Sequence, residues 1–435
     1  MARSKSRIPL HVFLNGRMVG VLRRQSSGAI DFQYDPSWLS WKHTMPVSLS
    51  LPLREDRYIG DPVVAVFDNL LPDNDQLRRR LAQKARAEGH DTFNLLAAIG
   101  RDCVGALQFL PEGESPGPVG RIESRRITEK EIAKILADLK RTPLGISVED
   151  DFRISIAGAQ EKTALLFWKG NWHLPQGSTP TTHILKPEIG ILENGLDLSQ
   201  SVENEHLCMR LAQAFGLPVA TTRIEVFEGK QVLIVERFDR RWTTDRRLLR
   251  LPQEDFCQAL SMPSTLKYES DGGPGIKSIL EFLKGSDEPD TDQRIFLKAQ
   301  IVYWLLAATD GHAKNFSIGI APGGRFRLAP LYDVMSAQTN LDAKRIRRSK
   351  MKLAMAVGRR RHYVIDSILP RHFIQTGELS GLSGRMVEEI MDELREQVPG
   401  AIDRTLKELP RNFPAKLVDS IVGGVQNRLR LSDRK

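Results

Sequence analysis

The chain has 435 residues, 41% of them hydrophobic and 27% charged, with a formal net charge of +9. This composition predicts a soluble intracellular enzyme of two to three domains with a sizeable core, and the sequence contains no membrane span. The three cysteines, Cys103, Cys208 and Cys257, stand far apart without metal-ligand spacing, which excludes a disulfide framework and a structural zinc site and favours the reducing cytoplasm.

The first 110 or so residues alternate short strand-like runs with Gly, Pro and Asn turns, and a helix is predicted at Asp75–Glu88. The short apolar run after the basic amino terminus meets Asn15-Gly16, which indicates a hairpin turn rather than a signal peptide. Pro111–Gly120 is rich in Pro and Gly and predicts a linker. A helix at Glu129–Lys140 then leads into a mixed α/β segment that ends near Asp239.

Small residues separate two strand-like stretches within residues 154–166. Such residues let backbone N–H groups approach phosphate oxygens, so this segment is a candidate phosphate loop. It is not a Walker sequence, because Glu161 stands where a Gly should precede the Lys, and a tight hairpin explains the pattern equally well. The candidate loop residues are Ala157, Gly158, Ala159, Gln160, Glu161 and Lys162.

A short predicted strand, Thr181–Lys186, ends in a lysine that needs an anionic partner. In kinases such a strand lysine contacts the nucleotide phosphates and a helix glutamate. The following amphipathic stretch, Val202–Phe215, offers Glu203 and Glu205, and the sequence does not choose between them. Ordinary surface ion pairs are an equally good explanation of these residues.

A third strand, Val232–Val235, ends abruptly in the charged run that begins at Glu236. Backbone groups at such a strand exit can read the edge of an adenine. The sequence therefore predicts that the nucleotide-binding lobe ends near this strand, at about Asp239.

Asp310 and Asn315 lie in Thr309-Asp310-Gly311-His312-Ala313-Lys314-Asn315, directly after the apolar run Ile301–Ala308. Their spacing is the D-x-x-x-x-N interval of a kinase catalytic loop, in which the Asp accepts the proton of the attacking hydroxyl and the Asn binds magnesium. Asp333 would supply the second metal ligand, since Mg²⁺ prefers oxygen ligands and takes one or two carboxylates plus phosphates. Alone, the motif is also compatible with an ordinary polar loop in which Asp310 caps a turn.

The segment Lys344–Arg361 holds nine Lys or Arg residues and no acid, which equals the whole net charge. Such a run forms either a solvated face or a contact with nucleic acid phosphates. Its position after Asp333 favours contact with a substrate. The candidate residues are Lys344, Arg345, Arg347, Arg348, Arg359, Arg360 and Arg361.

The segments ISIAGAQEKTALL, RLPQEDFCQALSMPSTLKYESDGGPGI and ATDGHAKNFS, together with FDNLLPDN, IGRDCVGAL and PRHF, resemble the HipA toxin family of serine/threonine kinases. The resemblance implies an α+β, protein-kinase-like, two-lobed fold with an α/β amino-terminal part and an all-helical carboxy-terminal lobe. The expected domains are 1–110, of the family's amino-terminal type, and a nucleotide-binding lobe at 128–240 after a linker at 111–127. The helical catalytic lobe is expected at 241–435, where long apolar periodicities agree with it.

The resemblance also implies roles for individual residues. Asp310 is similar to the family's catalytic base, Asn315 and Asp333 to its metal ligands, and Ser155 to its autophosphorylated serine. The implied cofactors are ATP and Mg²⁺. The implied ATP-binding residues are the loop 157–162, Lys186, Glu236, Arg237, Phe238, His312, Ala313, Lys314, Asn315, Tyr332 and Asp333.

The partners implied by the resemblance are a HipB-like antitoxin dimer, operator DNA bound through the complex, and glutamyl-tRNA synthetase as protein substrate. Phosphorylation of Ser155 would place about −1.5 to −2 charge beside the phosphate loop and should switch the enzyme off. Two alternatives stay open, a small-molecule phosphotransferase and a DNA-binding corepressor without catalytic activity.

Overall fold

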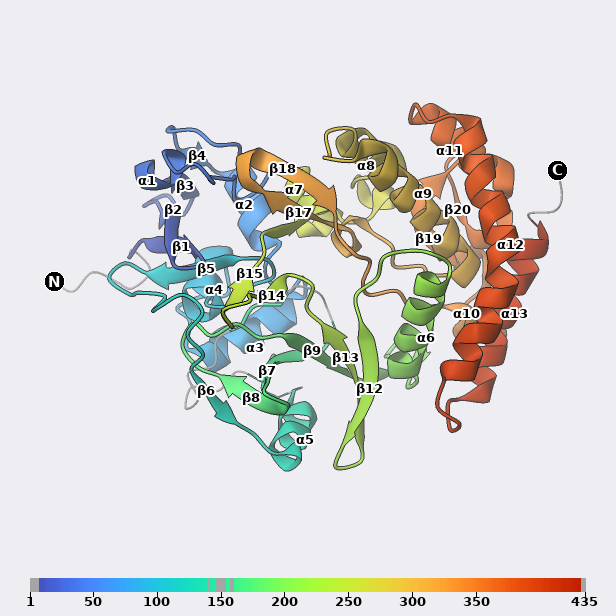
Figure 1. Ribbon diagram of the computed structural model, residues 1–435, viewed down its shortest axis with the longest axis horizontal. Coiled ribbons are helices and arrows are strands. Elements are labelled where there is room, and N and C mark those ends of the chain that lie inside the picture. The colour runs from blue at the N-terminus through green and yellow to red at the C-terminus, as the bar shows by residue number, and fades with distance from the viewer. Residues whose placement is uncertain (1–7, 140, 146–153, 157–159, 432–435) are drawn as a thin grey trace. The chain divides into compact units, whose positions relative to one another are not determined.

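A computed structural model describes residues 8–139, 141–145, 154–156 and 160–431 (Figure 1). Residue contacts group the chain into two compact units, each assembled from three segments of the sequence. Unit 1 comprises Met1–Pro187, Glu225–Thr265 and Ile318–Phe326, and unit 2 comprises Glu188–Ile224, Leu266–Ser317 and Arg327–Lys435. Within the described part of the chain, no helix has both the length and the apolar composition needed to cross a membrane.

Unit 1 begins with a five-stranded sheet in the order β4-β3-β2-β1-β5. The β1–β2 turn has Asn15 at φ 45° and Gly16 at φ 80°, and left-handed backbone at both central positions is what a tight hairpin turn requires. The hairpin predicted from Asn-Gly is thereby confirmed. The strands are β1 Leu10–Leu14, β2 Arg17–Arg24, β3 Ile30–Tyr34, β4 Tyr58–Ile59 and β5 Leu107–Pro111.

Four helices accompany this sheet. The predicted helix at residue 75 is present as α3, where the Asn74 side chain caps the first turn by accepting the Leu77 N–H. It ends at Arg86, whose φ of 53° stops the helical hydrogen-bond pattern. The helices are α1 Pro36–Leu39, α2 Asp61–Asp68, α3 Asp75–Ala85 and α4 Thr92–Ile99.

A second sheet has six strands in the order β12-β13-β9-β7-β8-β6. Antiparallel pairing of β13 with β9 places Lys186 opposite Leu233, so the lysine belongs to a central strand. The helix α5 (Glu129–Asp138) starts with a capping box between Thr128 and Glu131. The strands are β6 Ser124–Arg126, β7 Thr163–Trp168, β8 Asn171–Pro175, β9 His183–Pro187, β12 Thr222–Phe227 and β13 Lys230–Glu236.

The two sheets share one hydrophobic core. A continuous cluster of buried side chains runs from Phe32 and Phe67 in the first part to Leu165 and Ile234 in the second sheet. Because the described buried residues of both sheets form one cluster, residues 10–110 and the second sheet are expected to unfold together.

Shorter elements complete this part of the chain. The hairpin β14–β15 is followed by a three-stranded sheet in the order β16-β17-β18. The bounds are β14 Arg240–Trp242, β15 Leu248–Arg250, β16 Gln253–Asp255, α7 Phe256–Ala259, β17 Ser317–Ala321 and β18 Arg325–Leu328.

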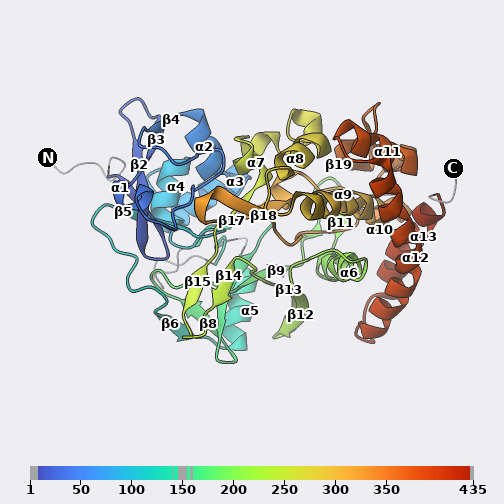
Figure 2. The same ribbon diagram turned by 45° about the horizontal axis from the view of Figure 1, so that its top comes forward.

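Unit 2 is built mainly from helices around α9, which contacts α13, α12, α8 and α6. The last two helices, α12 and α13, run alongside one another in both views (Figures 1 and 2). The helices are α6 Ser201–Ala214, α8 Ile276–Leu283, α9 Pro289–Leu306, α10 Gln338–Asp342, α11 Pro370–Leu379, α12 Gly384–Glu408 and α13 Ala415–Leu431.

The prediction that residues 241–435 are all helical was wrong in detail. This part of the chain contains the strands β14 to β18 and also the antiparallel pair β19 (Lys352–Val357) and β20 (His362–Val364). These strands have three to six residues, too few for a period of two to stand out beside the long helical patterns. Unit 2 also holds the two-stranded pair β10 (Gly190–Ile191) and β11 (Asp197–Leu198).

Candidate active site

The DGHAKN segment follows a rigid helix end. The last turn of α9 is fully buried, and Ala307 caps it in the left-handed conformation, with φ 53°. The Ala308 N–H then donates to the Tyr303 carbonyl oxygen at 2.8 Å, which completes the helix termination. The polar residues that follow are therefore held in place by buried structure.

Gly311 brings this loop close to α9. A Cβ atom at Gly311 would lie 2.3 Å from Cδ2 of Tyr303, so the aromatic ring occupies the space where any side chain would be. Glycine is required here for the close approach of backbone and ring.

Asp310 is the exposed member of the loop, with 59% of its side chain accessible. Its Oδ1 accepts a hydrogen bond from the Tyr268 hydroxyl and lies 3.8 Å from Nε2 of His312. The Tyr268 and His312 rings meet edge to face at 4.9 Å. The carboxylate is thus oriented by an aromatic pair while it remains exposed to solvent.

Tyr268 was not identified from the sequence as a site residue. It lies 42 residues before Asp310, in a segment that carries the family resemblance but no catalytic motif. A hydroxyl followed by Glu269 gives no local signal of its function, so only the folded structure could reveal this contact.

Asn315 is nearly buried at 6% exposure and lies in the 3-10 turn Ala313–Asn315. Its Nδ2 donates to the carbonyl oxygen of Asp310 at 2.7 Å, which leaves the side-chain oxygen as the part of the amide that can bind a cation. This orientation fits the metal-ligand role predicted for Asn315.

Asp333 has a left-handed backbone, with φ 60°. Aspartate tolerates this conformation better than most residues, but it still stores strain of the kind found at functional sites. The flanking residues are well anchored, because Leu331 donates to Pro218 and the Ser336 N–H donates to Oδ1 of Asn204 at 2.8 Å. The backbone on either side of Asp333 is therefore held in place.

Tyr332 and Lys314 connect the Asp333 segment to the loop. The Tyr332 hydroxyl donates to the Lys314 carbonyl oxygen at 2.8 Å and lies 2.5 Å from the Ser317 hydroxyl. Lys314 and His312 are buried, at 6% and 4% exposure, and Ala313 is fully buried. The predicted residues of the DGHAKN loop and Tyr332-Asp333 thus belong to one connected set within unit 2.

The donor set of unit 2 suits magnesium bound together with a nucleotide. Asp333 and Asn315 offer oxygen ligands, as a hard cation prefers. No group of three or more His, Cys, Asp or Glu side chains in the described ranges could hold a metal ion. A metal at Asn315 and Asp333 would therefore depend on phosphate oxygens for its remaining ligands.

The two glutamates left open by the sequence differ in burial. Glu205 is 3% exposed, whereas Glu203 is only half-buried. Both lie in α6, where the neighbouring Asn204 anchors Ser336. Burial of a carboxylate requires a specific partner, so Glu205 is the better candidate for a functional charge.

In unit 1, Ser155 is completely buried. Its Oγ donates to the carbonyl oxygen of Leu70 at 2.7 Å, and its N–H donates to that of Asp102 at 2.9 Å. A phosphate group cannot occupy this position beside a carbonyl acceptor, so a phosphorylated Ser155 must leave it.

Of the predicted phosphate loop, Ala157, Gly158 and Ala159 lie outside the described residues. Gln160 Nε2 donates to the Pro187 carbonyl oxygen at 3.2 Å, and Glu161 pairs with Arg80 at 2.9 Å. Lys162 and Lys186 are both buried at 7% exposure. Both lysines belong to unit 1.

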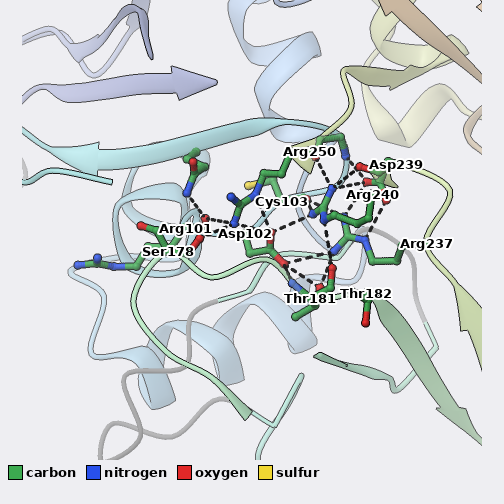
Figure 3. Close-up of polar contacts among 12 residues, drawn as sticks. Arg101, Asp102, Cys103, Ser178, Thr181, Thr182, Arg237, Asp239, Arg240 and Arg250 are labelled. Atoms are coloured by element: carbon green, nitrogen blue, oxygen red, sulfur yellow. Dashed lines mark hydrogen bonds and ion pairs between the residues drawn. The ribbon is translucent and has the colours of Figure 1, made fainter. Parts of the chain in front are cut away.

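The strand exit at Glu236–Phe238 contains an ionic cluster that the sequence did not predict (Figure 3). The predicted hinge residue Arg237 directs its side chain into this cluster, while Glu236 is exposed and Phe238 half-buried. The backbone N–H of Arg237 donates to the Thr182 carbonyl oxygen at 2.9 Å. The Arg237 side chain therefore holds the strand exit in position.

The cluster consists of three arginines and two aspartates, all at most 8% exposed. Asp102 lies 3.4 Å from Arg237 and 2.9 Å from each of Arg240 and Arg250, and Asp239 lies 2.7 Å from Arg237 and 3.0 Å from Arg240. Burial by itself would raise the pKa of Asp102, but the three guanidinium groups hold that pKa well below its usual range. Burial and the repulsion by Arg237 lower the pKa of Arg240 to about 10.

The basic segment is exposed at all seven predicted residues. Four of them form ion pairs: Arg345 with Asp197, Arg348 with Asp366, Arg359 with Glu378 and Arg361 with Glu269. Lys344, Arg347 and Arg360 form no ion pair with the residues that the structure describes. The local positive charge is thus partly compensated, and Arg347 and Arg360 are the arginines best placed to bind a partner.

The chain is similar in sequence to known protein families and to individual relatives. A family model described as the HipA-like C-terminal domain matches residues 154–402, and one described as the HipA N-terminal domain matches residues 10–110. The Sinorhizobium fredii protein Y4mE, whose name describes it as a kinase, is 38% identical over 355 residues, 81% of each chain. The serine/threonine-protein kinase toxin HipA of Shewanella oneidensis is 27% identical over 416 residues, 93% of this chain and 90% of the relative.

The fold is also similar to a solved structure. A chain in the Shewanella oneidensis complex of HipA, HipB and operator DNA superposes with a TM-score of 0.81 and 25% identity, covering 98% of this chain and 97% of that chain. The predicted α+β, kinase-like fold and the family resemblance are both confirmed. The chain therefore belongs to the HipA family.

Proposed function

We propose that this protein is an ATP- and Mg²⁺-dependent serine/threonine protein kinase. The observation that carries the proposal is the local geometry of unit 2, where an exposed Asp310 and a metal-competent Asn315 are joined by a hydrogen bond of 2.7 Å through the Asp310 carbonyl oxygen. Asp333 completes the oxygen donors. The relatives named as kinases support the same class of reaction.

Asp310 is the proposed catalytic base. As the substrate serine Oγ bonds to the γ-phosphorus and the bond to the ADP oxygen breaks, the serine proton passes to the Asp310 carboxylate. The Tyr268 hydroxyl, which donates to Oδ1, holds this carboxylate in one orientation. The high exposure of Asp310 suits a protein substrate better than a small alcohol in an enclosed pocket.

The proposed nucleotide contacts are Lys162 and Lys186 of unit 1 for the phosphates, and the proposed metal ligands are Asn315 and Asp333 of unit 2. When bound, Mg²⁺ neutralises charge on the phosphates. We propose Glu205, the buried one of the two candidates, as the helix glutamate of the kinase. The Glu236–Phe238 backbone is proposed to read the adenine with groups other than the Arg237 N–H, which donates to the Thr182 carbonyl oxygen.

Ser155 is the proposed autophosphorylation site. Since its hydroxyl is buried against Leu70, the segment must leave this position before it can be phosphorylated, and the added charge prevents its return. Autophosphorylation would then act as an off switch.

We further propose that the protein is the toxin of a toxin–antitoxin pair. A HipB-like antitoxin dimer and operator DNA bound through that complex are the proposed partners, supported by the similarity to the Shewanella complex. Glutamyl-tRNA synthetase is the proposed substrate, on the family resemblance alone. The three cysteines are buried free thiols, which suits a cytoplasmic location.

The decisive experiment is phosphoryl transfer from γ-labelled ATP. Wild type should label itself and a protein substrate, Asp310→Asn should label neither, and Asp403→Asn, at an exposed position of α12, should behave as wild type. Preferential labelling of small alcohols would indicate a small-molecule phosphotransferase. Absence of transfer by wild type would instead indicate a corepressor without catalytic activity.

The basic segment is proposed to contact the substrate. Arg347→Ala with Arg360→Ala should slow phosphorylation of the substrate more than it weakens operator binding by the antitoxin complex. The matched control is Arg345→Ala with Arg348→Ala, which removes the same charge from residues held by Asp197 and Asp366. A larger effect on operator binding would contradict the proposal.

A further inference from the structure

Tyr303 is a buried polar residue that the kinase mechanism leaves unexplained. It lies in the last turn of α9 with 2% of its surface exposed. Its hydroxyl oxygen is buried and has no hydrogen-bond partner within the described part of the chain. Buried tyrosine hydroxyls normally find a partner, so this one is available to donate to an acceptor near the end of α9.

The ring of Tyr303 is fixed in position. It fills the space beside Gly311 and packs against Phe316, with ring centroids 5.4 Å apart. Gly311 belongs to the DGHAKN loop, and Phe316 directly follows that loop. The hydroxyl therefore cannot swing away to find another partner without displacing that loop.

The surroundings of the hydroxyl are acidic. Burial is the largest cause that raises the pKa of Tyr303, and the negative charges of Asp333 and Asp310 raise it further. Smaller contributions come from Cys208 and Glu205. A tyrosine hydroxyl is protonated at neutral pH and can donate, and the proposed metal ligand Asp333 is the first of the carboxylates whose charge acts on it.

Tyr34 is a buried tyrosine of this protein whose hydroxyl does have hydrogen-bond partners. It is also 2% exposed, but its hydroxyl donates to the Leu51 carbonyl oxygen at 2.5 Å and accepts the Val47 N–H at 2.9 Å. The two tyrosines are equally buried and differ in whether the hydroxyl is used.

We propose that Tyr303 is a positioning residue whose hydroxyl donates to the Asp333 carboxylate when metal and nucleotide are bound. Binding of metal and nucleotide would supply the acceptor of this hydroxyl by fixing the orientation of the Asp333 carboxylate. This inference rests on the proposed function, because it assumes that Asp333 is a metal ligand.

The test compares the stability of the ligand-free protein with metal binding. Tyr303→Phe removes the unpaired hydroxyl, so the melting temperature without ligand should rise or stay level. The affinity for Mn²⁺ in the presence of ADP, measured by the electron paramagnetic resonance of free Mn²⁺, should fall by about tenfold. Affinity for ADP without metal should not change.

Tyr34→Phe is the matched control. It should lower the melting temperature, because it removes a hydroxyl with two partners, and leave Mn²⁺ binding unchanged. If Tyr303→Phe lowers the melting temperature or binds Mn²⁺ and ADP as wild type does, the inference is overturned. If wild type itself binds no Mn²⁺ with ADP, and Asp333→Asn changes nothing, the proposed metal site fails as well.

Discussion

Glu254 should make the stability of this protein depend on pH. This carboxyl group lies in β16 with 1% exposure, and its Oε1 accepts the Leu49 N–H at 2.9 Å. Its other oxygen is buried and has no hydrogen-bond partner among the described residues. Burial raises the pKa of Glu254 from 4.5 to about 8, against the smaller opposing effect of the Leu49 N–H.

The sign follows from the two pKa values. Because the folded pKa lies above the unfolded one, the contribution of Glu254 to stability is fully present below pH 4.5 and is lost as the pH rises towards 8. At about 1.4 kcal/mol per pKa unit, the loss between pH 5 and pH 7 is on the order of 2.5 kcal/mol. Glu254→Gln cannot ionise, so it should not show this loss.

Urea unfolding at pH 5, 6 and 7 measures the effect. The stability of Glu254→Gln relative to wild type should increase by about 2 to 3 kcal/mol from pH 5 to pH 7. Asp403→Asn, at an exposed carboxylate, should show no such trend. A stability difference between Glu254→Gln and wild type that does not change with pH would refute the argument that Glu254 is buried in its neutral form.

Three further predictions follow from other sites. Asp102→Asn should reduce the free energy of unfolding by about 3 to 5 kcal/mol, because it leaves the buried guanidinium groups without their main counter-charge; a loss below about 1 kcal/mol in urea unfolding would contradict this. Ala307→Gly should stabilise the protein by up to about 1 kcal/mol, since glycine adopts the left-handed cap of α9 without strain, and a lower melting temperature would contradict it. Ser155→Asp should weaken ATP binding, measured by calorimetry, because the Leu70 carbonyl oxygen repels the aspartate and the segment then leaves its position. Ser155→Ala is not repelled and should retain the affinity for ATP. Equal affinities of the two variants would contradict the prediction.

The sequence predicted the parts whose signals are local. The hairpin at Asn15-Gly16, the helix at Asp75 and the strand that contains Lys186 all depend on neighbouring residues, and each is present, although the strand runs from His183 to Pro187. The buried run before Asp310 is the end of α9, as its continuous apolar character indicated.

What the sequence did not reveal depends on contacts between distant residues. Tyr268 reaches Asp310 across 42 positions, and Asp102 reaches Arg237 across 135. No periodicity records such pairs, so the sequence did not reveal that the Arg237 side chain lies in a buried ionic cluster. The burial of Ser155 against Leu70 was hidden for the same reason.

The ionic cluster around Asp102 also bears on how the chain is made. The ribosome releases Asp102 long before Arg237, Arg240 and Arg250, so the aspartate has none of these partners while more than a hundred further residues are added. Domains usually fold in the order of synthesis. Here Asp102, which precedes the last strand of the first sheet, cannot form all its ion pairs until Arg250 has left the ribosome. Folding of the amino-terminal part should therefore be delayed, and translation halted before that point should yield a chain open to proteases and chaperones.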